Sequence, residues 1–358
     1  MDVLTLILLV AGFVLLIGGA ELLVRGAAHL ASDLGISPLV VGLTVVSFGT
    51  SAPELAVSTF SAWNGQAGLA LGNVVGSNIC NILLILGVSA LVAPLAVARQ
   101  VVRLEVPIML AASLLLMLLS LNSGLERWEG LLMFACAVAY VSWTIMRSRK
   151  ENRDEAPHCD LPAGPRPRRL WQILQIMAGL ALLGSGSHWL VGGAVSIATY
   201  FGVSDMVIGL TVVAIGTSLP ELATSALAAL RGQRDIAVGN VIGSNIFNIL
   251  LVLGLTASVA PVAIAIPQQA MMVDLPIMLA ASFAALSIFL TGHRIDRWEG
   301  GLFFGYFVAY IVFTVLHALR HPHMDLFVQA MTFFFIPLTA ITLVLSLWRA
   351  RRQRRTPT

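Results

Sequence analysis

The stretch that decides the fold is GLTVVSFGTSAPELAVS at residues 42–58, because it returns as GLTVVAIGTSLPELATS at residues 209–225. A second pair follows at the same offset of 167, with GNVVGSNICNILLILG at residues 72–87 and GNVIGSNIFNILLVLG at residues 239–254. Aligned without gaps over forty-seven positions, the two copies share thirty identities. The chain is therefore an internal duplication, and each copy is expected to build one half of the fold.

The composition around this repeat is that of a membrane protein. Of the 358 residues, 58% belong to the set AVILMFWYC and 11% are charged, against about 45–50% and about 25% in an ordinary soluble domain. A soluble enzyme is excluded on these figures. Apolar runs long enough to cross a bilayer are expected at residues 3–24, 37–61, 67–91, 104–121, 128–146, 171–199, 206–229, 236–257, 271–291, 298–317 and 326–348.

These runs divide the chain into four parts. Residues 1–146 form a first repeat of five spans, and residues 171–319 form a second. Between them, residues 147–170 are basic and rich in proline, which is typical of a linker. Residues 320–358 hold the eleventh span and a basic tail. The predicted fold is an all-α membrane protein of ten transmembrane helices in two five-helix repeats, plus an eleventh C-terminal helix.

The basic residues orient this topology. With the N-terminus outside and the C-terminus in the cytoplasm, nineteen of the twenty-one Lys and Arg residues fall on the cytoplasmic side, and only Arg127 and Arg320 fall outside. We therefore expect a multi-pass protein of a prokaryotic inner membrane, whose net charge of +3 reflects topology and not nucleic-acid binding.

An odd number of spans in each half makes the second half enter the membrane from the opposite side. The predicted repeats are therefore inverted. Transporters of this build place their substrate near the midplane, on helices that Gly or Pro interrupts. Proline supplies that interruption in both copies of the first motif, at Pro53 and Pro220, because it lacks an N–H group and releases carbonyls from the helix.

Each interrupted helix places a carboxylate beside hydroxyl groups. At helical spacing Ser47, Thr50, Ser51 and Glu54 share one face, and Thr217, Ser218 and Glu221 repeat the arrangement. The second motif adds two polar stripes with steps of four residues, Asn73, Ser77 and Asn81 in one half and Asn240, Ser244 and Asn248 in the other. Oxygen ligands without His or Cys are what Ca²⁺ and other hard cations prefer. Two carboxylates would balance one Ca²⁺ or two Na⁺.

Some of these polar residues have a second interpretation. Asn73, Asn240, Asn78 and Asn245 could equally serve as hydrogen-bonding links between helices. Glu21 lies one turn from Arg25, so we expect a local ion pair there. Glu105 and Asp274 precede prolines near span ends and are interpreted as gate or capping residues.

The paired GTS-x-PEL and GN-x-x-GSN-x-x-NIL motifs resemble those of the calcium/cation antiporter superfamily, and most of all its prokaryotic sodium/calcium exchangers. The resemblance implies a central site in which Ca²⁺ competes with Na⁺ and access alternates between the two sides. It makes Glu54 and Glu221 the central ligands and lets Asn81 and Asn248 complete the centre. It also implies sodium positions lined by Thr50, Ser51, Ser77, Thr217, Ser218 and Ser244, with backbone oxygens at Ser47 and Ala214.

One position departs from the family pattern. Many sodium-dependent members have Asp where this chain has Asn248, which leaves the driving ion open.

The main hypothesis is an antiporter that exchanges Ca²⁺ for Na⁺. The alternative is a proton-driven antiporter in which Glu54 or Glu221 accepts the proton, since burial disfavours the charged form of a carboxylate. A channel fits a single enclosed site less well, and an intramembrane protease would need a base or His ligands near Ser51 or Ser218. No cofactor is expected beyond the transported ions. The sequence leaves open whether the protein forms a homo-oligomer.

Overall fold

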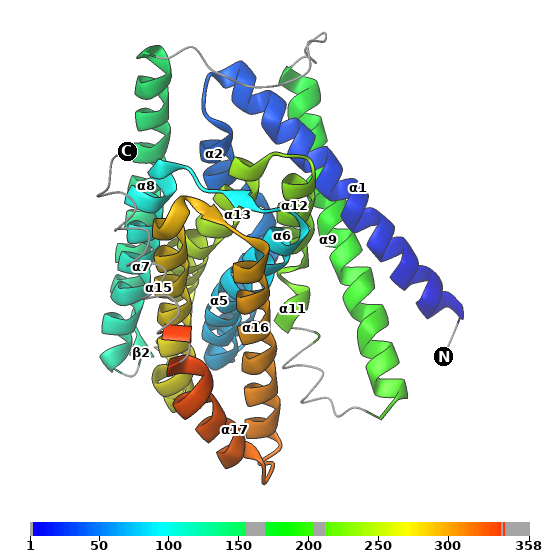
Figure 1. Cartoon of the computed structure of the whole chain (residues 1–358), viewed down its shortest axis with the longest axis vertical. Coiled ribbons are helices and arrows are strands. Elements are labelled where there is room, and N and C mark those ends of the chain that lie inside the picture. The colour runs from blue at the N-terminus through cyan, green and yellow to red at the C-terminus, as the bar shows by residue number, and fades with distance from the viewer. Residues whose placement is uncertain are drawn as a thin grey trace, which may run out of the picture.

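The computed structural model describes residues 3–122, 124–154, 169–202, 212, 214–337 and 339–340. The protein is an all-helical membrane protein (Figure 1). Among the described residues, eight helices are long and apolar enough to cross a bilayer, and a bent pair over Pro38–Trp63 would make a ninth. Parts of the expected seventh span (206–211 and 213) and of the eleventh (338 and 341–348) lie outside the described residues, as does Cys159 in the linker.

The N-terminal half comprises α1 (Val3–Leu34), α2 (Pro38–Val41), η1 (Gly42–Val46), α3 (Ser47–Thr50), α4 (Ala52–Trp63), α5 (Ala67–Cys80), η2 (Asn81–Leu86), α6 (Gly87–Val92), β1 (Leu95–Ala96), η3 (Val101–Glu105), α7 (Val106–Leu119), η4 (Ser120–Asn122), β2 (Gly124–Leu125) and α8 (Arg127–Asp154). Helix α8 continues to Asp154 and so includes the first eight residues of the expected linker, in which proline first occurs at Pro157.

The C-terminal half comprises α9 (Arg169–Tyr200), α11 (Ala214–Gly216), α12 (Leu219–Leu230), α13 (Arg234–Phe247), η6 (Asn248–Leu253), α14 (Gly254–Val259), β3 (Ile264–Ala265), η7 (Ala270–Asp274), α15 (Leu275–Gly292), β4 (Arg294–Ile295) and α16 (Arg297–Ala318). Helix α17 (Met324–Ala330) and η8 (Met331–Phe335) follow it.

Two helices of equivalent sequence form the centre of the bundle. One runs from Gly68 to Val92 and the other from Arg234 to Val259. In their most apolar stretch of 18 residues, 83% and 94% of the residues are buried, respectively, whereas only 11% are buried in the corresponding stretch of Arg297–Ala318. Each contains a π-helical turn that begins at the last asparagine of the second motif, Asn81 in η2 and Asn248 in η6. Such π-turns are frequent at functional sites.

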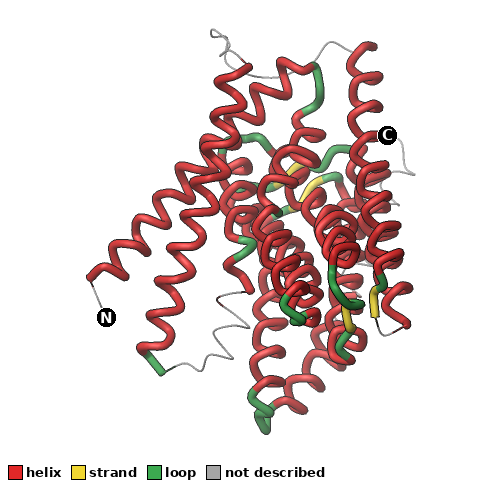
Figure 2. The backbone as a smooth tube through the Cα atoms, turned by 180° about the vertical axis from the view of Figure 1, so that it is seen from behind, coloured by secondary structure: helices red, strands yellow, loops and turns green. Residues whose placement is uncertain are grey.

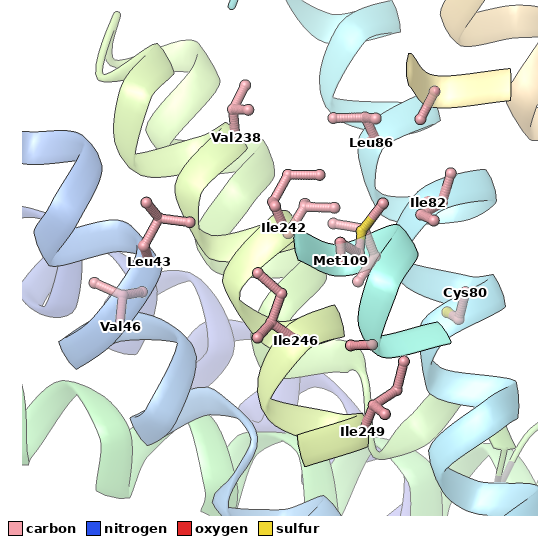
Figure 3. Close-up of a cluster of buried hydrophobic side chains, with 14 of the residues drawn as sticks. Leu43, Val46, Cys80, Ile82, Leu86, Met109, Val238, Ile242, Ile246 and Ile249 are labelled. Carbon is pink, nitrogen blue, oxygen red and sulfur yellow. The ribbon is translucent and has the colours of Figure 1, made fainter. Parts of the chain in front are cut away.

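Apolar side chains pack around these central helices. Figure 3 shows Ile82 and Leu86 of η2 and Met109 of α7 close to Ile242 and Ile246 of α13. All five side chains are buried. These side chains belong to one apolar cluster that joins the central helices to α7.

Helices α1 and α9 lie side by side along one edge of the bundle (Figures 1 and 2). Glycines permit this approach: a Cβ atom on Gly19 would lie 2.8 Å from the Gly179 carbonyl, and one on Gly12 would lie 2.8 Å from the Gly186 carbonyl. Close backbone contact through small residues is typical of packed transmembrane helices.

Contacts between the two halves come in matched pairs. Strand β1 pairs with β4, and β2 pairs with β3, although β1 corresponds in sequence to β3 and β2 to β4. The two antiparallel ribbons lie toward opposite ends of the bundle (Figure 2). Each loop of one half therefore meets a non-equivalent loop of the other half.

Candidate ion-binding site

The first motif forms a broken helix in each half. In the N-terminal half the helix ends at Thr50 and resumes at Ala52 with a bend of 43°. In the C-terminal half α11 ends at Gly216 and α12 begins at Leu219. Each proline occupies the start of the resumed helix, where its missing N–H group costs nothing.

This geometry places both carboxylates in the first turns of helices. Glu54 lies in the first turn of α4 and Glu221 in the first turn of α12. Both side chains are fully buried. The partial positive charge at a helix N-terminus favours an anion in this position, so the break and the carboxylate support each other.

Serines of the opposite half hold the two carboxylates. Ser51 Oγ donates to Glu221 Oε1 at 3.3 Å, and Ser218 Oγ donates to Glu54 Oε1 at 3.4 Å. Each carboxylate is therefore tied to the broken helix that carries the other carboxylate. The structure thus brings together four of the seven residues that the first motif singled out.

Asn73 links the two broken helices. Its amide nitrogen donates to Ser58 Oγ at 3.0 Å and to the Glu54 backbone carbonyl at 3.3 Å. Its amide oxygen accepts a hydrogen bond from the Thr217 hydroxyl at 3.4 Å. The interpretation of Asn73 as a link between helices is therefore confirmed.

Asn240 makes the same three bonds in the other half. It donates to Ser225 Oγ at 2.9 Å and to the Glu221 backbone carbonyl at 3.4 Å, and it accepts from the Thr50 hydroxyl at 3.2 Å. Thr50 and Thr217 consequently bind amide oxygens of the opposite half while they line the polar centre.

The remaining polar side chains of this centre are buried with unpaired atoms. Asn81, Asn248, Ser77 and Ser244 each expose 1% or less of their surface. Among the described residues, no hydrogen-bond partner is found for six oxygens: Glu54 Oε2, Glu221 Oε2, Asn81 Oδ1, Asn248 Oδ1, Ser77 Oγ and Ser244 Oγ. Buried polar groups without partners are costly, so oxygens gathered in this way suit a ligand that coordinates oxygen.

The two expected backbone ligands differ from each other. The Ser47 carbonyl accepts the Ser51 N–H at 3.0 Å and the Thr50 hydroxyl at 3.4 Å. Ala214 begins α11. Ser218 is the counterpart of Ser51, but its backbone N–H group donates to the Ile215 carbonyl and not to the Ala214 carbonyl. The helix break is therefore not identical in the two halves.

The donor set is made of oxygen atoms. In the part of the chain that the structure describes, no three His, Cys, Asp or Glu side chains gather into a metal site. The centre instead combines two carboxylates with hydroxyl and amide groups. Such a set fits hard cations and lacks the imidazole and thiolate groups that softer metals prefer.

Glu105 and Asp274 lie outside this centre. Glu105 accepts hydrogen bonds from Tyr140 at 2.8 Å and Gln100 at 2.9 Å, and Asp274 accepts one from Tyr310 at 3.2 Å. Neither side chain makes a capping hydrogen bond, so the capping interpretation is wrong. Glu105 instead binds Tyr140 of α8, and Asp274 binds Tyr310 of α16. These tyrosines were not predicted from the sequence, although Tyr140 and Tyr310 match each other at an offset of 170.

Glu21 is also separate from the centre. The expected ion pair with Arg25 is confirmed, and Arg231 adds a second contact at 2.8 Å. This arrangement ties α1 to the turn between α12 and α13.

Comparisons with known proteins agree with this geometry. A family model described as "Sodium/calcium exchanger protein" matches residues 4–146 and 171–316. The chain is 43% identical over 288 residues to the putative antiporter CaxA of Alkalimonas amylolytica, which covers 79% of this chain and 90% of that protein. It is 38% identical over 310 residues to the inner membrane protein YrbG of Escherichia coli (strain K12), covering 85% and 94% of the two chains.

An archaeal relative and a solved structure extend the match. The sodium/calcium exchanger MaX1 of Methanosarcina acetivorans is 33% identical over 347 residues, covering 87% of this chain and 99% of that protein. The sodium-calcium exchanger NCX_Mj, in a structure soaked with Na⁺ and Ca²⁺, superposes with a TM-score of 0.75 at 29% identity, covering 87% of this chain and 99% of that one. The chain therefore belongs to the sodium/calcium exchanger family.

Proposed function

We propose that this protein is a secondary antiporter that moves Ca²⁺ across the membrane in exchange for Na⁺. The observation that carries the proposal is the set of six buried oxygens without hydrogen-bond partners among the described residues, all of which belong to the two repeated motifs. The printed names of MaX1 and NCX_Mj, both sodium/calcium exchangers, support the same pair of ions.

The proposed calcium ligands are Glu54, Glu221, Asn81 and Asn248. Two carboxylates match the charge of one Ca²⁺ or two Na⁺, so the exchange of these ions keeps the centre neutral. The proposed sodium positions are lined by Thr50, Ser51, Ser77, Thr217, Ser218 and Ser244, with backbone oxygens at Ser47 and Ala214.

Alternating access follows from the proposed inverted relationship of the halves. The reciprocal hydrogen bonds of Ser51 and Ser218 support a two-fold relationship, as does the pairing of β1 with β4 and of β2 with β3. In transporters built from inverted repeats, the movement of one bundle against the other opens a fixed central site to one side at a time.

The proposed orientation has the N-terminus outside and the C-terminus in the cytoplasm of a prokaryotic inner membrane. It rests on the distribution of basic residues between the loops. The description of YrbG as an inner membrane protein supports the location.

A proton-driven exchange of Ca²⁺ is the second candidate. The observation that favours it is the neutral amide at both Asn81 and Asn248, which leaves Glu54 and Glu221 as the acidic groups of the centre. In this case the carboxylates would bind protons in turn with Ca²⁺.

Uptake of ⁴⁵Ca²⁺ into proteoliposomes under imposed Na⁺, K⁺ and H⁺ gradients separates the candidates. We expect Ca²⁺ uptake when the Na⁺ concentration is higher inside the vesicles than outside. We expect no uptake with the Glu54→Gln protein. Uptake that follows only the H⁺ gradient would favour the second candidate. The absence of Ca²⁺ movement under all three gradients would reject both.

A further inference from the structure

Asn78 is a buried residue that adjoins the proposed ion site without belonging to its ligands. It lies on α5, exposes 1% of its surface, and contacts three elements through its amide group. Its nitrogen donates to the Asn245 backbone carbonyl at 3.3 Å and to Met278 Sδ at 3.6 Å. Its oxygen accepts from Asn248 Nδ2 at 3.1 Å.

The direction of this chain of hydrogen bonds is fixed at one end. A backbone carbonyl can only accept, so Asn78 must turn its nitrogen toward Asn245 and its oxygen toward Asn248. Asn248 must then turn its nitrogen toward Asn78. Its own oxygen faces away from Asn78, is buried, and has no partner among the described residues.

The equivalent residue in the other half does not act in this way. Asn245 donates to the Val241 carbonyl of its own helix at 2.7 Å. Asn81, the counterpart of Asn248, has neither its amide oxygen nor its amide nitrogen paired within the described part of the chain. One amide of the centre is therefore oriented by a hydrogen bond, whereas no hydrogen bond within the described residues orients the other.

We propose that Asn78 is a positioning residue that holds Asn248 with its carbonyl oxygen turned into the ion site. This inference rests on the proposed function, because it concerns the ligands of the same cation. An amide turned the other way would present its N–H₂ group, which repels a cation. Asn78 therefore makes a neutral side chain a pre-organised oxygen ligand.

The test measures equilibrium binding of ⁴⁵Ca²⁺ to the purified full-length protein without Na⁺. We expect Asn78→Ala to weaken binding about tenfold, the equivalent of one lost hydrogen bond. The matched variant Asn245→Ala should change binding less than about twofold, since its side chain bonds within its own helix. Thermal unfolding checks that each variant is folded. If Asn78→Ala does not fold, Asn78→Ser takes its place in the binding measurement.

A double-mutant cycle separates orientation from packing. In the Asn248→Asp background both terminal side-chain atoms are oxygens, and the Asn78 oxygen has no N–H group to accept from. Asn78→Ala should therefore no longer weaken Ca²⁺ binding in that background. The same tenfold loss in both backgrounds would overturn the inference, as would an equal loss in Asn245→Ala.

The proposed function fails in a different way. If the unmodified protein binds no Ca²⁺, the proposed exchange of Ca²⁺ is rejected, and the same cycle is then measured with ²²Na⁺. Coupling between positions 78 and 248 in Na⁺ binding would still support the positioning role, and its absence would overturn it.

Discussion

Ser51 of one half donates a hydrogen bond to Glu221 of the other half at 3.3 Å. Because Ser218 does the same for Glu54 at 3.4 Å, neither half can form its carboxylate site alone. The oxygen of each carboxylate that is not held by a serine lacks a partner among the described residues. The halves thus cooperate in orienting two oxygens toward one centre.

The first prediction tests these serines. Ser51→Ala and Ser218→Ala each remove one hydrogen bond to a buried carboxylate, so each should weaken Ca²⁺ binding about fivefold to fifteenfold. A matched control is Thr59→Val, which removes a hydroxyl bonded to Thr256 at 3.2 Å outside the centre. Equal effects of all three substitutions on ⁴⁵Ca²⁺ binding would contradict the proposed role of the serines.

The second prediction concerns the carboxylates themselves. Glu54→Gln and Glu221→Gln should each abolish Ca²⁺ transport while the protein stays folded, since each removes half of the formal charge of the centre and little volume. Glu21→Gln is the control, because Glu21 pairs with Arg25 and Arg231 instead. It should lower thermal stability more than ion binding. Near-normal ⁴⁵Ca²⁺ exchange by either glutamine variant would reject the shared site.

The repeat made it predictable from the sequence that the polar side chains of the first motif lie close together. Two carboxylates at equivalent positions beside prolines are hard to explain as packing, and in the structure each of them accepts a hydrogen bond from a serine of the opposite half. The orientation of Asn248 was not predictable. Residues 78 and 245 are both asparagine, so the difference between their hydrogen bonds arises from tertiary packing and not from residue type.

Interaction partners that are distant in the sequence were also not predictable. The pair of Glu21 with Arg25 follows from helical spacing, whereas its contact with Arg231 joins positions 210 residues apart. The tyrosine partner of Glu105 lies 35 residues away on another helix. Local patterns indicate which side chains share a helix face, but the choice of partner depends on how helices pack.

The third prediction tests the link between Glu105 and Tyr140. Tyr140→Phe removes one of two hydrogen bonds to a carboxylate that is 0% exposed, so it should cost about 1–3 kcal/mol of stability. Tyr310→Phe should cost less, because Asp274 is only partly buried. Thermal unfolding in detergent measures both, and a larger loss for Tyr310→Phe would show that burial does not decide the cost.

The fourth prediction tests the orientation in the membrane. Cys159 lies in the basic linker, which is cytoplasmic in the proposed orientation. A thiol reagent that cannot cross membranes should leave it unlabelled in intact cells and label it after lysis. A Cys159→Ser variant identifies the labelled residue. Labelling of intact cells would reverse the proposed topology.

The last prediction concerns the packing of α1 against α9, where two adjacent glycines provide a matched comparison. A Cβ atom on Gly19 would lie 2.8 Å from both the Gly179 carbonyl and the Leu183 nitrogen, whereas one on Gly18 would meet nothing within 4 Å. Backbone atoms cannot move aside as a flexible side chain can, so Gly19→Ala should force the helices apart and cost about 1–3 kcal/mol. Gly18→Ala should be neutral or stabilise the helix by at most about 1 kcal/mol, since Ala favours a helix over Gly. Thermal unfolding and ⁴⁵Ca²⁺ exchange measure the two variants, and equal stabilities would show that α1 and α9 are not held in close backbone contact.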